Sequence, residues 1–219
     1  MENVRRSKIS VVPARKIHLS NILPRGDLCY EVLRSVDRDG VQQPLIVRPL
    51  KENPEEYEII DGASRLWVLR EDQHVPVEIR YGLKDSEVFR IREATFKRRQ
   101  RTTCEKAEYY SRWVWVLSQE TDKRGGQARV ARMAGVREGE ISQYLAIHKT
   151  FRELEHLQTS ATPFKALKNQ SINKLYELSK LRGSPALLEV AGELAQHLKM
   201  PIRRLRRMVK EKTEMKKLA

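Results

Sequence analysis

Apolar residues in the first hundred positions recur in two different rhythms. Four short segments, 8–12, 45–48, 57–60 and 75–81, are rich in β-branched residues and are typical of strands. Two other segments, 27–39 and 63–71, carry apolar residues at helical spacing, and Gly40 is a natural stop for the first of them. These alternating patterns predict a compact α+β domain.

From Ser86 onward the strand pattern disappears and only helical spacing remains. One helix is predicted through Val88 and Phe96, and Thr102 with Glu105 forms the capping-box signature of the next. That next helix has an apolar stripe made of Ala107, Tyr110, Trp113, Val114 and Leu117. Segment 122–126 breaks the pattern, and further amphipathic helices are predicted at 171–180, 185–198 and 201–212. We therefore expect two domains, α+β at 1–100 and all-α at 101–219.

Residues 127–148 have the pattern of a helix-turn-helix. Ala131 is small enough for a helix crossing, and Gly135 suits a tight turn with positive φ. Two short helices closing over one core are predicted from the apolar residues Val130, Ala134, Val136, Ile141 and Tyr144. Such a unit reads double-stranded DNA by placing its second helix in the major groove. The alternative is an ordinary helical hairpin.

The same segment supplies the candidate DNA contacts. The second helix is expected to present base-reading side chains, namely Arg137, Glu138, Ser142 and Gln143. The candidates for contact with the phosphate backbone are Arg129, Arg132 and Lys149, and Gln127 is a further candidate DNA-binding residue.

The charge of the chain agrees with a polyanionic partner. Its 219 residues include 43 Lys and Arg against 29 Asp and Glu, a formal net charge of +14. The segment from Lys199 to the end holds nine Lys or Arg and two Glu, and a second basic run spans 97–101. Both runs are expected to hold phosphates, and 201–212 is the basic C-terminal helix. No apolar run approaches the ~20 residues that span a bilayer, so no membrane partner is expected.

Cysteine usage and the N-terminus indicate a cytoplasmic protein. Cys29 and Cys104 are isolated, without the clustered Cys or His residues of a zinc site, so no metal site of this kind is expected. The first residues, Met-Glu-Asn-Val-Arg-Arg, lack the apolar core of a signal peptide.

Five stretches, taken in order, resemble the ParB family of DNA-segregation proteins. Segment 40–48 resembles the family's first box, 57–65 its second box and 75–79 the strand that follows. The helix-turn-helix lies where the family places it, and 200–209 resembles the last helix of the family's central helical domain. The resemblance implies a ParB/sulfiredoxin-like N-terminal α+β domain followed by an all-α DNA-binding domain.

The resemblance also implies a ligand and partners. ParB proteins bind CTP with magnesium in the N-terminal domain, and the nucleotide closes a dimeric clamp around DNA. Carried over by position, the candidate nucleotide-binding residues are Gly40, Gln43, Pro44, Gly62, Ala63, Ser64, Arg65 and Arg98. The implied partners are a second copy of the chain and a ParA-like ATPase, and the implied location is the nucleoid or a plasmid.

Two departures from the family weaken this picture. Ala63 and Ser64 replace a glutamate and an arginine of the second box, and Ala94 and Thr95 replace a later glutamate and asparagine. Efficient CTP hydrolysis is therefore not expected, while nucleotide binding stays open. The chain also ends soon after its last predicted helix, as in a short form without a separate C-terminal dimerisation domain.

Three functions remain to be weighed. The first is a partition protein that recognises a centromere-like DNA site. The second is a transcriptional regulator on the same fold without a nucleotide-gated clamp. The third is a nuclease or another enzyme of the ParB/sulfiredoxin fold, for which the second box lacks a reactive cysteine and the clustered carboxylates of a two-metal site.

Overall fold

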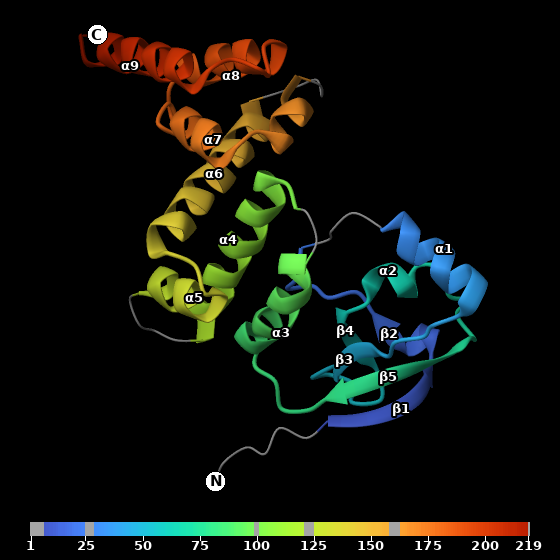
Figure 1. The fold of residues 1–219 in the computed structure, drawn as a ribbon. Helices are drawn as coiled ribbons and strands as arrows, with labels where there is room; N and C mark the ends of the chain where they lie inside the picture. Colours follow the sequence, from blue (N-terminus) through green and yellow to red (C-terminus); the bar gives the residue numbers. More distant parts are fainter. Residues whose placement is uncertain (1–6, 25–28, 99–100, 121–124, 158–162, 219) are drawn as a thin grey trace. The chain divides into compact units, whose positions relative to one another are not determined.

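The protein is represented by a computed structural model that describes residues 7–24, 29–98, 101–120, 125–157 and 163–218. Contacts within the chain divide it into two compact units, Met1–Arg99 and Gln100–Ala219 (Figure 1). Each unit is described on its own below.

The first unit is built on one mixed sheet with the strand order β1-β5-β3-β4-β2. Strand β5 pairs antiparallel with β1 and parallel with β3, while β4 pairs antiparallel with β3 and parallel with β2. The strands are β1 (Ser7–Pro13), β2 (Ile17–His18), β3 (Leu45–Pro49), β4 (Tyr57–Asp61) and β5 (His74–Arg80). Since side chains alternate along a strand, one face of the sheet collects the apolar residues of the core.

Three helices accompany the sheet, α1 (Tyr30–Asp39), α2 (Ala63–Leu66) and α3 (Asp85–Arg98), with a 3₁₀ turn η1 (Ala14–Lys16). The core on the sheet is fully buried at Leu45, Val47 and Val77, and Ala63 and Leu66 of α2 pack against it. Helix α3 lies against β4 and buries Val88. The loop between β4 and α2 is thereby fixed over the end of β4.

Most predicted elements of this unit are present, and one is wrong in length. The four predicted strands match β1, β3, β4 and β5 to within one or two residues, whereas β2 was not predicted. Helix α1 begins at Tyr30, and 27–28 lie outside the described residues. The helix predicted at 63–71 ends at Leu66, because Trp67 and Val68 are exposed rather than packed on the core, and the chain continues in turns such as the hydrogen bond from the Leu69 N–H to the carbonyl of Leu66.

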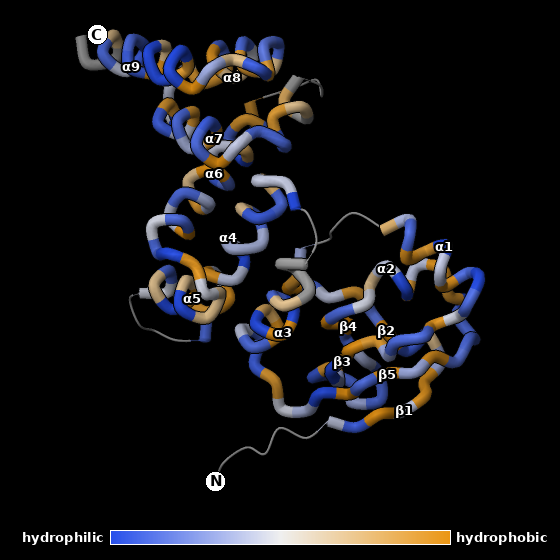
Figure 2. The backbone as a smooth tube through the Cα atoms, viewed as in Figure 1, coloured by the Kyte–Doolittle hydropathy of each residue, from blue (hydrophilic) through white to orange (hydrophobic). Residues whose placement is uncertain are grey.

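In its described residues the second unit contains helices and no strands. Its helices are α4 (Thr103–Glu120), α5 (Gly126–Ala134), α6 (Glu138–Leu157), α7 (Ile172–Ser179), α8 (Ala186–Gln196) and α9 (Ile202–Leu218), with a 3₁₀ segment η2 (Pro163–Asn169). Apolar and hydrophilic stretches alternate along these helices, as expected where each helix buries one face (Figure 2). The predicted break at 122–126 falls largely on 121–124, outside the described residues.

An aromatic cluster forms the centre of this unit, where α4 packs on α6. Trp113 is fully buried and stacks on Tyr110 with ring centroids 6.5 Å apart, and Tyr110 also contacts Tyr144 at 5.3 Å. The predicted α4 stripe is buried except for the half-buried Val114, and Tyr109 joins it. The cluster connects α4 to the second helix of the predicted helix-turn-helix.

A helix must be both long and apolar to span a bilayer. In the described part of the chain, no helix is long and apolar enough to do so.

Candidate nucleic-acid interface and nucleotide cavity

Helices α5 and α6 meet through a tight turn centred on Gly135. Its backbone is left-handed, with φ of 65° and ψ of 38°, which glycine adopts at little cost. The Gly135 N–H donates to the carbonyl of Arg132 at 3.3 Å, and the Val136 N–H donates to the carbonyl of Ala131 at 3.0 Å. Ala131 is 3 % exposed, so only a small residue fits there. These hydrogen bonds end α5 and turn the chain into α6.

The second helix of this pair is longer than predicted. Helix α6 has 20 residues, where two short helices were expected. The apolar stripe that starts at Ile141 continues through Ile147, Phe151 and Leu154, and no glycine or proline interrupts it. The helix therefore runs on from the turn into the rest of the unit.

The exposed face of α6 carries several of the predicted DNA-contacting residues. Glu138, Ser142 and Lys149 are exposed, and at about 100° per residue they lie within about 40° of one another around the helix. Arg137 is exposed just before the helix, and its carbonyl accepts hydrogen bonds from the N–H groups of Glu140 and Ile141. These residues form one outward row that begins at the turn.

Two of the predicted DNA contacts are less accessible than expected. Gln143 was expected to point outward, but it is half-buried because it lies about 100° around the helix from Ser142, towards the buried Ile147. Gln127, near the start of α5, is also half-buried.

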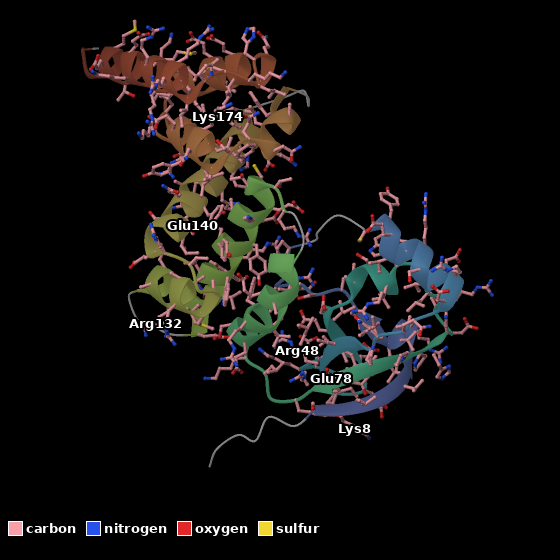
Figure 3. The ribbon with its side chains drawn as sticks, viewed as in Figure 1. Lys8, Arg48, Glu78, Arg132, Glu140 and Lys174 are labelled. Carbon is pink, nitrogen blue, oxygen red and sulfur yellow. The ribbon has the colours of Figure 1, made fainter. Side chains whose placement is uncertain are left out.

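The predicted DNA surface is dominated by free positive charge. Arg129 and Arg132 of α5 are exposed, as are Arg137 and Lys149, and Figure 3 labels Arg132. Within the described residues, none of these four cations has an acidic partner within 4.0 Å. Unpaired cations beside an exposed helix face can bind phosphate oxygens without losing a contact to the fold.

The basic run at 97–101 does not form a comparable surface where it is described. Residues 99 and 100 and the side chains of 97 and 98 lie outside the described set. The Arg101 side chain is 8 % exposed and donates to the carboxylate of Glu105 at 2.8 Å. The expected phosphate contact is therefore wrong for Arg101, because its guanidinium is paired and buried.

In the first unit a cavity of about 370 Å³ lies between α1 and the β4–α2 turn. Five of the predicted nucleotide-binding residues line it, namely Gly40, Gln43, Gly62, Ser64 and Arg65. Pro44 and Ala63 are not among its lining residues, and the Arg98 side chain lies outside the described set. Two segments far apart in sequence thus meet at one cavity.

Gly62 is required at the turn that leads from β4 into α2. Its φ is 100°, and a Cβ atom there would lie 2.6 Å from Cδ2 of Leu45 and 3.0 Å from Nη2 of Arg65. A side chain at this position would strain the backbone and collide with the core of the sheet. The glycine therefore allows the Arg65 guanidinium to lie over the turn.

The polar groups of the cavity are already partly engaged. The Arg65 guanidinium donates to the carbonyls of Gln43 and Pro44, the latter at 3.3 Å. Ser64 is 6 % exposed, and its hydroxyl accepts a hydrogen bond from the Cys29 N–H at 3.4 Å. Among the described residues that line the cavity, Arg65 is the one cation and Asp61 is an anion. The described part of the walls therefore offers a polyphosphate little fixed positive charge.

The sequence reading missed the residues that α1 contributes to this cavity. Val32, Ser35 and Val36 line it, and so does Asp61 at the end of β4. The available signal was the position of α1 directly before the 40–44 segment, since a helix that leads into a site places one face against it.

A buried ion network holds the opposite part of this unit and was also not predicted. Arg48 on β3 donates from Nε to Glu58 on β4 at 2.7 Å and pairs through Nη1 with Asp85 at 2.6 Å. Glu58 also accepts from the Ser20 hydroxyl at 2.6 Å. Because Asp85 begins α3, Arg48 ties the start of that helix to the sheet.

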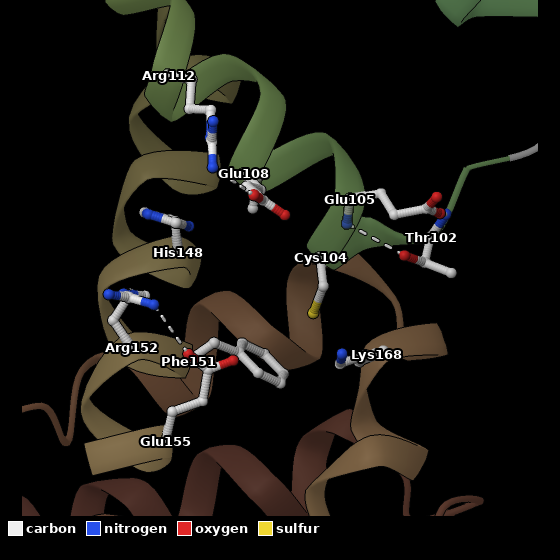
Figure 4. Close-up of a pocket in the computed structure, with 11 residues that line it drawn as sticks. Thr102, Cys104, Glu105, Glu108, Arg112, His148, Phe151, Arg152, Glu155 and Lys168 are labelled. Carbon is white, nitrogen blue, oxygen red and sulfur yellow. Dashed lines mark hydrogen bonds and ion pairs between the residues drawn. The ribbon is translucent and has the colours of Figure 1, made fainter. Parts of the chain in front are cut away.

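A second polar cavity, of about 400 Å³, lies among α4, α6 and η2 (Figure 4). Burial raises the pKa of its Cys104 thiol to about 12, so the thiol is protonated at neutral pH and is a poor nucleophile. Burial lowers the pKa of His148, which favours its neutral form. Arg112 pairs with Glu108 and Arg152 with Glu155 around the same space.

Metal-binding groups do not converge in the described part of the chain. No group of three or more His, Cys, Asp or Glu residues there has the geometry to hold a metal ion.

Comparison with known proteins agrees with this arrangement. Residues 2–93 match the family model of the ParB N-terminal domain. No curated protein matches the sequence. Among solved structures, the C-terminally truncated chromosome-partitioning protein ParB from Caulobacter crescentus, complexed to the centromeric parS site, is similar over 92 % of this chain and 99 % of its own, with 16 % identity and a TM-score of 0.53. At this identity the likeness concerns the fold.

Two further solved structures are more distant. The same Caulobacter protein complexed with CTP-gamma-S matches with 18 % identity and a TM-score of 0.37, covering 88 % of this chain and 99 % of that one. A Pnob8-like ParB-N domain matches with 16 % identity and a TM-score of 0.49, covering 98 % of this chain and 84 % of that one. Residues 2–93 thus match the ParB N-terminal domain, and the fold of the chain is similar to that of a solved ParB protein.

Proposed function

We propose that this chain is a sequence-specific DNA-binding protein that acts in plasmid or chromosome partition by recognising a centromere-like site. The observation that carries the proposal is the α5–α6 pair, whose glycine turn leads into an exposed helix face flanked by unpaired arginines. A solved ParB of the same fold is complexed to its centromeric parS site. The location that follows is the nucleoid or a plasmid.

In this proposal α6 enters the major groove with its first turns. Arg137 and Ser142 contact base edges, because a guanidinium can bind guanine through two hydrogen bonds and a hydroxyl can donate or accept. Glu138 lies on the same face and can accept from cytosine. Gln127 and Gln143, which are half-buried, contribute DNA contacts at the edges of this surface. Phosphate contacts come from Arg129, Arg132 and Lys149.

The test compares one base-contacting residue with one phosphate-contacting residue. A preferred site is first selected from random duplexes, and binding to that site and to random DNA is then measured by fluorescence anisotropy. Arg137→Ala is expected to weaken binding to the preferred site by ~1–3 kcal/mol and to leave random DNA nearly unchanged. Lys149→Ala is expected to weaken binding to both duplexes equally and to lower the salt dependence of that binding.

The result that would sink this assignment is an Arg137→Ala variant that loses the same affinity on both duplexes. A wild-type protein that selects no preferred sequence would exclude site-specific recognition altogether.

Since one helix-turn-helix reads a half-site, we propose a homodimer on an inverted repeat, and a ParA-like ATPase as the partner in partition.

We further propose that the cavity between α1 and the β4–α2 turn binds CTP with magnesium. The support is the meeting of Gly40, Gln43, Gly62 and Arg65 at one cavity within the ParB N-terminal domain. Magnesium would neutralise phosphate charge that Arg65 alone does not balance. Efficient hydrolysis is not expected, because Ala63, Ala94 and Thr95 replace polar residues of the family.

Calorimetric titration tests the nucleotide proposal. CTP with magnesium is expected to bind the wild-type protein more tightly than ATP or GTP does, and Arg65→Ala is expected to lose that binding. Arg38→Ala is a suitable control, because Arg38 lies on α1 but pairs outside the cavity with Asp39 at 2.8 Å. Equal heats for all three nucleotides, or for both variants, would contradict CTP-selective binding.

A transcriptional regulator without a nucleotide-gated clamp is the second candidate. It is favoured by the engagement of Arg65 with the carbonyls of Gln43 and Pro44, which leaves the cavity short of free cations. Site-specific DNA binding together with no heat from any nucleotide would support this candidate.

A further inference from the structure

Helix α9 carries two sets of cations with different surroundings. The first set lies along its sides and is bound to acidic residues of the fold. Arg204 pairs with Glu193 at 2.8 Å, and Lys212 pairs with Glu189 at 2.7 Å, both on α8. Arg206 lies 3.5 Å from the buried Glu177 of α7. Lys180 also pairs with Glu177. The contacts of Arg204, Arg206 and Lys212 hold α9 against α7 and α8.

The second set lies on the outer face of α9. Arg203 and Arg207 are exposed, and at about 100° per residue both lie roughly opposite the buried Leu205. Neither has an acidic partner within 4.0 Å among the residues that the structure describes. Lys210, on the same face, is 3.7 Å from Glu214 within the helix, which places the free charge in the first two turns.

This outer face is separate from the first turns of α6. In Figure 1, α5 and α9 lie at opposite ends of α6 within the helical unit. Helix α6 has 20 residues and is therefore about 30 Å long. Arginines on α9 consequently do not belong to the surface that reads base edges.

We propose that the first two turns of α9, together with the exposed Lys199, form a second binding face for the phosphate backbone of duplex DNA, independent of base sequence. This inference rests on the proposed function only in taking DNA as the partner. Guanidinium groups suit phosphates because they present paired N–H donors. The two arginines can donate without giving up a contact to the fold.

The surroundings favour DNA over other anionic partners. An amphipathic helix that binds a membrane surface inserts its apolar face. In α9 that face is buried in the fold, with Leu205 0 % and Val209 2 % exposed. A protein partner would need an apolar centre in its interface. Between Lys199 and Lys210 the exposed outer face offers charge instead, as a polyanion requires.

The test uses the full chain and a random-sequence duplex, with affinity measured between 50 mM and 200 mM salt. Replacing two phosphate contacts lowers the slope of log K against log salt by about 1.8. Over this range the wild-type protein should therefore lose about 12-fold more affinity than R203Q/R207Q does. The matched control is R204Q/K212Q, which removes the same charge from the same helix but from the docking set. Its slope should match the wild type, while its melting temperature falls.

Three results would overturn the proposal. These are an unchanged slope in R203Q/R207Q, an equal drop in both double variants, or a loss confined to phosphatidylserine vesicles while duplex binding is retained. The proposed function fails separately. If the wild type selects no preferred site but R203Q/R207Q still loses affinity for random DNA, the α9 face is supported and sequence recognition is not. If Arg137→Ala removes specificity and the slope of R203Q/R207Q is unchanged, only the α9 face is excluded.

Discussion

Single residues were predictable where the backbone decides their role. Gly135 was assigned to a positive-φ turn from its place between two apolar patterns, and the turn has that geometry. Side chains that pair through the tertiary fold were not predictable. No contact was predicted for Arg48 or Ser20, yet both hydrogen-bond to Glu58, and Arg48 also pairs with Asp85. Their partners are chosen by packing rather than by local spacing.

At Gly62 the structure predicts a cost beyond backbone strain. Gly62→Ala and Gly125→Ala both place an alanine in the left-handed region, at φ of 100° and 99°, with an expected cost of about 1–2 kcal/mol. Only Gly62 has a neighbour within reach of the new Cβ, at 2.6 Å from Leu45, so its variant should lose about 1–3 kcal/mol more. Urea unfolding measures both. Equal losses would mean that the core around Leu45 yields to the methyl group.

Whole elements were predictable where their pattern is long. Strands β1, β3, β4 and β5 and the helices from α3 onward follow from periodicity. The two-residue β2 carries too short a pattern, and α2 is shorter than predicted because Trp67 and Val68 do not pack on the core. Helix α6 exceeds its expected length because the helix-turn-helix signature describes only its first turns. The spacing of apolar residues thus predicts which element forms, and tertiary contacts determine where it ends.

The start of α4 confirms a signature read from two residues. The Glu105 N–H donates to the Thr102 hydroxyl at 3.1 Å, and the Thr102 N–H donates to the Glu105 carboxylate at 2.8 Å. Thr102→Ala is expected to lower the free energy of unfolding by about 1 kcal/mol. Thr102→Ser retains the hydroxyl and should stay near the wild type. If chemical denaturation gives the two variants the same stability, the cap contributes nothing.

At the scale of the whole molecule, the change from strand to helix patterns predicts a domain boundary near residue 100. Contacts within the chain divide it between Arg99 and Gln100. The sheet order β1-β5-β3-β4-β2 did not follow from the chain, because the pairing of distant strands depends on packing. The cavity lined by α1 and Arg65 was not predictable for the same reason, because packing brings its walls together from distant segments.

Since α5 and α6 both lie in the second unit, the proposed DNA recognition is expected to belong to that unit. A chain restricted to residues 100–219 is expected to keep the ratio of affinities for a half-site duplex and a random duplex, because α5, α6 and their core lie within it. Anisotropy titration of this fragment against the full chain measures the ratio. Circular dichroism confirms that the fragment is helical. A folded fragment that no longer distinguishes the duplexes would place part of the recognition in residues 1–99.

Helix α6 also connects the two ends of the helical unit. It has 20 residues, starts at the turn after α5 and contacts α4, α7 and α8 along its length. A rod of about 30 Å that tilts by about 10° about one end moves its other end by about 5 Å. A small angular adjustment of α6 in a DNA groove would therefore displace α7 and α8 by about the length of one helical turn. The geometry of the groove is in this way amplified at the opposite end of the unit.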